Sequence, residues 1–146
     1  MQVMSMSDYV LLDANLLIGA FDHDDTNTKH IESKKIVESL LLDNNVKIAI
    51  TPLIRYEVLR GVRRVPTAQM VEILNDFEEF EITDIEGNRA SEIYRLAFAK
   101  NQKLDKRSFD VFHYVVAEIR DLKWMSQDTD ISKIASLAKP IIKGQL

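Results

Sequence analysis

Short apolar runs alternate along the chain with longer segments whose apolar residues recur at helical spacing. Residues 9–12 form an apolar run that predicts a buried strand, and the alternating, β-branched residues 46–50 predict a second one. Further strands are predicted around residues 80–82, 123–125 and 140–142. Helices are predicted from near residue 15, over 28–42, 52–61 and 67–77, around 90–97, over 109–119 after a cap at Ser108, and after 130.

This alternation predicts the α/β class, with a mostly parallel central sheet of four to five strands flanked by helices, because parallel neighbours need crossover connections. The 146 residues fit a single domain over 1–146. Ligands of such sheets bind at the carboxyl ends of the strands. Asp13, Thr51 and Ser126 each follow a predicted strand, so we expect them at one edge of the sheet.

The composition, with 46% hydrophobic and 29% charged residues, is that of a globular protein. The absence of cysteine excludes disulfides, thiolate nucleophiles and cysteine zinc sites, and it favours the cytoplasm. Neither a signal peptide nor a run of about 18 apolar residues is present, so we expect neither secretion nor membrane insertion. The net charge of −4 argues against a nucleic-acid partner unless several acids surround cations.

Two acidic residues are unusual for their positions. Asp13 directly follows four apolar residues, and a partly buried carboxylate needs a partner or a metal ion; the alternative is a helix N-cap. Glu57 falls within the apolar stripe of its predicted helix, where an acid is rare. Its alternative is a salt bridge to Arg55, Arg60 or another basic residue.

Three further acids have weaker individual arguments. Asp110 lies in the first turn of a predicted helix, where the helix dipole alone would favour it. Asp128 and Asp130 compete for one role, either as a ligand or as a cap of the last helix. Carboxylates clustered at a sheet edge are the ligands that Mg²⁺ and Mn²⁺ require, so the combination predicts a metal site.

Four segments in order resemble the PIN-domain nucleases, and in particular the toxin subunits of VapBC-type toxin–antitoxin pairs. They are VLLDANLLI at 10–18, TPLIRYEVLRG at 51–61, DVFHYVVA at 110–117 and MSQDTDI at 125–131. The resemblance implies a PIN-like α/β/α sandwich and a Mg²⁺- or Mn²⁺-dependent endoribonuclease. It also implies a cognate antitoxin and a homodimer as partners.

By the same resemblance, four acids correspond to the family's catalytic and metal-binding residues: Asp13, Glu57, Asp110 and Asp128. Asn15 and Ser126 correspond to polar residues that support the site, and Thr51 is a further supporting residue. Ser126 replaces the more typical Thr and Ile131 stands where an aromatic residue is common, so Asp130 remains an alternative to Asp128.

RNA could approach this acidic site along two basic groups. One surrounds Glu57 and the other precedes Asp110: Arg55, Arg60, Arg63 and Arg64, then Lys100, Lys103, Lys106 and Arg107. Such contacts bind phosphates without reading sequence. The alternative is that they form solvated helix faces and a charged turn.

Other functions remain open. A solitary RNA-processing nuclease and a catalytically silent domain that binds RNA or protein both fit the same fold. A phosphatase that uses Asp13 as a covalent nucleophile is a weaker option, because an acid would be expected where Asn15 stands. The three histidines lack zinc-ligand spacing, and His113 is predicted to be structural.

Overall fold

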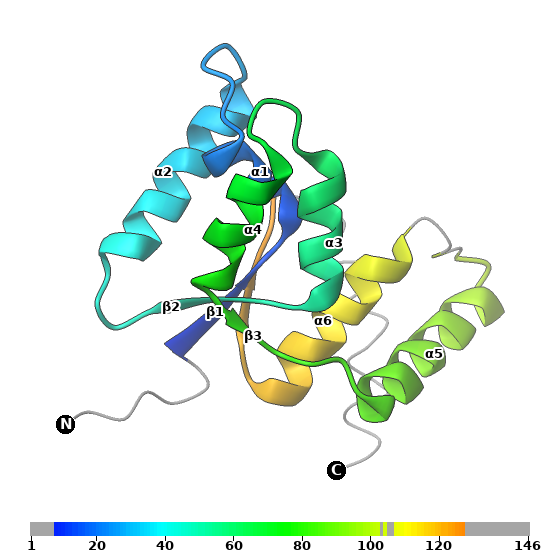
Figure 1. Cartoon of the computed structure of the whole chain (residues 1–146). Coiled ribbons are helices and arrows are strands. Elements are labelled where there is room, and N and C mark those ends of the chain that lie inside the picture. The colour runs from blue at the N-terminus through cyan, green and yellow to red at the C-terminus, as the bar shows by residue number, and fades with distance from the viewer. Residues whose placement is uncertain (1–7, 103, 105–106, 128–146) are drawn as a thin grey trace. The chain divides into compact units, whose positions relative to one another are not determined.

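The computed structural model describes residues 8–102, 104 and 107–127. These residues belong to two compact units: the first contains residues 8–81 and 121–127, and the second contains those from 82 to 120. Figure 1 shows the helices and strands, coloured by residue number. The single-domain organisation over 1–146 stays a prediction. The strand predicted at 140–142 and the helix predicted after 130 lie outside the described residues.

The first unit contains a four-stranded sheet in the order β3-β2-β1-β4, and all neighbouring strands are parallel. Its strands are β1 (Tyr9–Leu12), β2 (Lys47–Ile50), β3 (Glu78–Glu79) and β4 (Lys123–Met125). Val10 lies opposite Ile48 on one side and Lys123 on the other. The aliphatic residues of the two central strands are buried. The parallel pairing of all neighbouring strands confirms the predicted α/β class and its parallel sheet.

Six helices lie within the described part of the chain. The first unit has α1 (Ala14–Phe21), α2 (Thr28–Leu42), α3 (Pro52–Gly61) and α4 (Thr67–Asn75), and the second has α5 (Asp84–Ala99) and α6 (Ser108–Arg120). The helices predicted before residue 121 are confirmed, although α6 begins at Ser108 itself, so the expected cap is the first helical residue. Each of these helices is too short or too polar to cross a bilayer.

The strand predicted around residues 80–82 was misplaced, because β3 is Glu78–Glu79. These two glutamates pair with Ala49 and Ile50 of β2, and both are exposed at the sheet edge. Phe80 still donates its backbone N–H to the carbonyl of Ile50 at 2.9 Å, and its ring packs edge-on against Tyr9 at 5.7 Å. The apolar residue Phe80 therefore lies directly after β3, at the point where the chain leaves the sheet.

The apolar residues Ile31, Val37, Leu40 and Leu41, which fall at loose helical spacing in the sequence, form only part of the inward face of α2. Val37 is buried, but Ile31 and Leu41 are exposed, and Ser33 is fully buried instead. Ser33 lies against Gly19 of α1, where a Cβ would approach the Cβ and Oγ of Ser33 to 2.6 Å. Its hydroxyl donates to the carbonyl of Lys29 at 2.8 Å, so this polar side chain is satisfied inside the core.

We expect Gly19→Ala to lower the free energy of unfolding by about 1–3 kcal/mol, because the added methyl overpacks the contact with Ser33. Urea unfolding measures the change. Gly87→Ala is the matched control, since a Cβ on this glycine of α5 meets no atom within 4 Å. That variant should gain about 0.5–1 kcal/mol from helix propensity. Equal changes in both variants would contradict the close approach of α1 and α2.

Asp22, directly after α1, joins that helix to the loop between α3 and α4. Its side chain is 1% exposed and accepts the backbone N–H groups of Arg63 at 2.9 Å, Arg64 at 2.7 Å and Val65 at 2.8 Å. Burial raises the pKa of this carboxyl, but those three donors and the charge of Arg64 outweigh it, so the pKa lies below its ordinary value. Asp22 is therefore ionised in the folded protein, and its carboxylate holds the loop between α3 and α4 in place.

The second unit consists of α5 and α6, which pack against each other. The start of α5 carries a capping box, in which the backbone N–H of Thr83 donates to the carboxylate of Glu86 at 3.1 Å. The hydroxyl of Thr83 donates to the same carboxylate. Glu86 is buried and also contacts the guanidinium of Arg120 at 3.1 Å. Burial raises the pKa of Glu86, but the hydrogen bonds and the charge of Arg120 hold it below its ordinary value.

Candidate metal centre

The carboxyl ends of β1, β2 and β4 lie at one edge of the sheet of the first unit, because these strands are parallel neighbours. Asp13 directly follows β1, Thr51 directly follows β2 and Ser126 directly follows β4. This is the edge at which parallel sheets bind their ligands. The three polar residues are thus placed there by the strands that precede them.

Asp13 is 6% exposed and its carboxylate is held in one orientation by two donors. Oδ1 accepts the backbone N–H of Ala14 at 2.8 Å, and Oδ2 accepts the hydroxyl of Ser126 at 2.7 Å. Asp13 is also the N-cap of α1, which confirms the helix-capping role considered as the alternative to metal binding. A carboxylate can accept about four hydrogen bonds, so capping and metal ligation are compatible.

Asn15 and Ser126 form a hydrogen-bonded chain behind Asp13. The amide of Asn15 donates to Oγ of Ser126 at 3.1 Å, which leaves the serine hydroxyl proton directed at Asp13. The backbone N–H of Gln127 donates to Oδ1 of Asn15 at 3.4 Å and fixes which way the amide points. A serine 111 residues further along the chain than Asn15 thereby orients the buried carboxylate.

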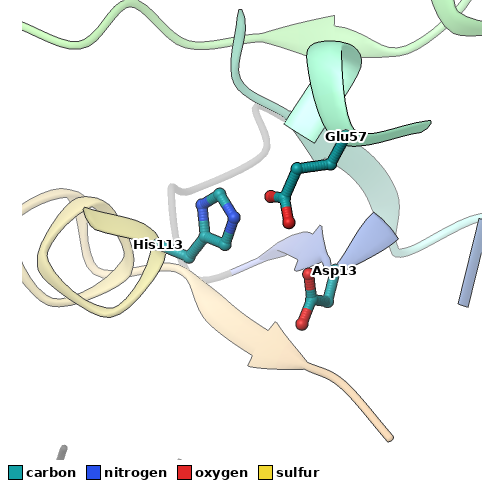
Figure 2. A group of neighbouring side chains, drawn as sticks. All are labelled: Asp13, Glu57 and His113. Carbon is teal, nitrogen blue, oxygen red and sulfur yellow. The ribbon is translucent and has the colours of Figure 1, made fainter. Parts of the chain in front are cut away.

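Glu57 reaches the same edge from α3. Thr51 is fully buried and caps this helix by accepting the N–H of Ile54 at 3.3 Å, and Pro52 occupies its first position. Carboxylate oxygens of Glu57 and Asp13 lie within 4.8 Å of each other, and Figure 2 draws the two side chains. Arg55, one of the salt-bridge partners considered for Glu57, instead binds Glu79, with its Nη2 2.6 Å from Oε1.

The two carboxylates suit a hard divalent cation. Mg²⁺ binds oxygen at about 2.0–2.1 Å, so two ligands of one ion are at most about 4.2 Å apart. The limit of 4.8 Å between Asp13 and Glu57 is close to that span, and a small side-chain movement closes the difference. A cation would also remove the repulsion between two negative groups, one of which is buried.

The PIN domain family matches residues 10–137. The chain belongs to the PIN domain family. Its members have a nuclease fold that typically depends on a divalent metal, in agreement with the carboxylates at the sheet edge. The predicted PIN-like fold is confirmed. The match identifies the family and does not distinguish the VapBC toxin subclass within it. Comparison with curated proteins gives no match.

In the second unit of this PIN domain, Asp110 occupies the first turn of α6. Its Oδ2 lies 3.4 Å from Nη1 of Arg107, one of the residues proposed to contact RNA. His113 follows three residues later and is 1% exposed, and this spacing places both side chains on one face of the helix. Figure 2 also labels His113. Asp128, Asp130, Lys103 and Lys106 lie outside the described residues.

The arginines predicted to guide RNA to the PIN domain differ in their contacts. Arg55 binds Glu79 through both Nε and Nη2. Arg64 contacts the carboxylates of Asp22 at 3.6 Å and Asp24 at 2.9 Å. These two side chains are therefore held by acids of the first unit, which reduces their availability for phosphate.

Proposed function

We propose that this PIN domain is a cytoplasmic Mg²⁺- or Mn²⁺-dependent endoribonuclease and the toxin component of a toxin–antitoxin pair. The observation that carries the proposal is the pair of carboxylates from Asp13 and Glu57, whose oxygens lie within 4.8 Å of each other. The two donors to Asp13 preorganise its side chain, as a metal site requires. Family membership supports nuclease chemistry at such a site.

The residues would divide the work as follows. Asp13 and Glu57 would bind the cation, and by the resemblance to the family Asp110 would supply a third carboxylate and Asp128 or Asp130 a fourth. A divalent cation held there would lower the pKa of water and neutralise charge that develops on the phosphate. Ser126 and Asn15 keep Asp13 oriented, and Thr51 fixes the start of the helix that carries Glu57.

RNA would reach the site over exposed basic side chains. Arg63 is exposed on the loop after α3, and within the described residues its guanidinium donates to the carbonyl of Arg60 at 3.3 Å, so its charge would attract phosphate. Arg60, Arg107, Lys103 and Lys106 are further proposed contacts for RNA. Contacts of this kind give an affinity that falls as the salt concentration rises.

We expect Mn²⁺ or Mg²⁺ to raise the melting temperature of the purified protein and to be required for RNA cleavage. A ligand at 100 times its dissociation constant adds about 2.7 kcal/mol to the free energy of unfolding. Thermal melts with each cation or with EDTA measure the first effect, and cleavage of end-labelled RNA measures the second. A catalytically silent domain would show no cleavage, and cleavage that persists in EDTA would refute metal dependence.

The proposed partners are an antitoxin and a second copy of the chain. A short reading frame next to this gene should encode a small protein that suppresses cleavage when the two are co-expressed. A gene without such a neighbour would favour a solitary RNA-processing nuclease with the same chemistry. Light scattering of the purified chain tests the homodimer.

A further inference from the structure

Gln127 connects the edge of the sheet that carries Asp13 to the first turn of α2. It directly follows Ser126, and its backbone N–H donates to Oδ1 of Asn15 at 3.4 Å. Its side-chain Nε2 donates to the backbone carbonyl of Lys29 at 2.8 Å. One residue thus joins the amide that supports Asp13 to a carbonyl that lies 98 residues earlier in the chain.

The carbonyl of Lys29 is a fixed anchor for that side chain. Asn27 caps α2 by accepting the backbone N–H of Lys29 at 2.9 Å, so the first turn of the helix is held in place. The same carbonyl accepts the hydroxyl of Ser33 at 2.8 Å, and Ser33 is fully buried against Gly19 of α1. Gln127 is therefore bound to a carbonyl whose position the core of the first unit fixes.

The contact between Gln127 and Asn15 decides which way the amide of Asn15 points. Because Oδ1 of Asn15 accepts the N–H of Gln127, its nitrogen faces Ser126 and donates to Oγ at 3.1 Å. The hydroxyl of Ser126 then donates to Oδ2 of Asp13 at 2.7 Å. If the amide of Asn15 turned over, its oxygen would compete for that hydroxyl proton, and Asp13 would lose the donor.

This contact is also sensitive to a shift of Gln127. Its donor–acceptor distance of 3.4 Å is at the long end of the range for a hydrogen bond, so a small further displacement would break it. The bond from the side chain to Lys29, at 2.8 Å, is well within that range. The side chain of Gln127 therefore keeps its backbone N–H within reach of Asn15.

We propose that Gln127 is a positioning residue of the metal centre. Through Asn15 and Ser126 it sets the direction in which the carboxylate of Asp13 meets the cation. This inference rests on the proposed metal-dependent function and deepens it. Replacing a residue that orients a metal ligand typically weakens metal binding by about 10- to 100-fold. Because Gln127 acts through two intervening side chains, we expect the lower end of that range.

A purely structural role for Gln127 predicts a different result. The hydrogen bond between its side chain and Lys29 is exposed to solvent, where water replaces a lost partner at little cost. Removing the side chain should therefore leave the melting temperature without metal within about 3 °C of the wild type. A structural role would instead lower that melting temperature and leave the affinity for the cation unchanged.

Titration of the purified protein with Mn²⁺, in which electron paramagnetic resonance reports the free ion, tests this role without cleavage. We expect Gln127→Ala to raise the dissociation constant of Mn²⁺ about 10-fold. Gln127→Met keeps the length of the side chain without its N–H donor, so it should show the same loss. Gln69→Ala, which shortens an exposed glutamine of α4, is the matched control and should change the dissociation constant by less than about 2-fold.

A double variant tests whether Gln127 acts through Ser126. Ser126→Ala removes the hydroxyl that donates to Asp13, so adding Gln127→Ala to it should weaken Mn²⁺ binding by less than about 2-fold further. A full additional loss of about 10-fold in the double variant would overturn the proposed role. Wild-type affinity in Gln127→Ala or in Gln127→Met would also overturn it.

The two proposals can fail separately. Unchanged Mn²⁺ affinity in Gln127→Ala, together with metal-dependent cleavage by the wild type, would remove the role of Gln127 alone. A wild type whose Mn²⁺ affinity depends on Gln127 but which does not cleave RNA would remove the ribonuclease function alone. A wild type that binds no Mn²⁺ would remove both.

Discussion

Asp13→Asn is expected to reduce metal-dependent RNA cleavage by at least about 100-fold while the protein stays folded. The amide has the shape of the carboxylate: its oxygen can still accept the N–H of Ala14, and its NH2 group can donate to the hydroxyl oxygen of Ser126. It lacks the negative charge that a divalent cation requires. Replacing even a residue that only orients a metal ligand costs about 10- to 100-fold, so the loss of a ligand should cost no less. Initial rates on end-labelled RNA measure the effect.

Glu57→Gln should cause a loss of the same order, and Glu72→Gln on the exposed surface of α4 should cause none. Without metal, we expect both site variants to melt no lower than the wild type, because each removes repulsion between two carboxylates within 4.8 Å. This combination separates a metal site from a structural role, which would lower the melting temperature. Full cleavage by the double variant would exclude these two acids from catalysis.

The edge of the sheet could be predicted because its determinants are local. The apolar run before Asp13 indicates a buried strand that ends at this residue, and the Thr51-Pro52 pair marks the start of a helix. Parallel pairing of β1 with β2 and β4 then brings the three strand ends together. Helical spacing alone predicts that Glu57 falls within the apolar stripe of its helix.

Contacts between distant parts of the chain could not be predicted. Ser33 is buried because the missing side chain of Gly19 lets two helices approach, and no periodic pattern within α2 contains that information. The boundary of β3 depends on its pairing with β2, whereas the apolar pattern favoured Phe80. The binding of Arg55 by Glu79 likewise joins residues 24 positions apart, so charge counts alone overstated the basic surface near Glu57.

Asp22→Ala should be among the most destabilising single substitutions in the first unit. Its carboxylate serves three backbone N–H groups that lie 41, 42 and 43 residues further along the chain. Each donor left unsatisfied costs about 1–3 kcal/mol where water cannot replace the acceptor. Because the loop is only partly buried, we expect a total loss of about 3 kcal/mol and a melting temperature lower by roughly 10 °C. Urea and thermal unfolding measure both, and Asp43→Ala, which removes one exposed contact to Asn45, should cost under about 1 kcal/mol.

The pH dependence of that loss distinguishes an ionised Asp22 from a protonated one. Its pKa in the folded state lies below the ordinary value, so ionised Asp22 stabilises the fold above about pH 4, where an unfolded aspartate is also ionised. As the pH falls below about 4 toward the folded-state pKa, this contribution disappears. The difference in free energy of unfolding between wild type and Asp22→Ala should therefore be constant from pH 7 to pH 5 and shrink below pH 4. A difference that instead grew on acidification would mean that the buried carboxyl is held as a neutral acid, contrary to its three N–H donors.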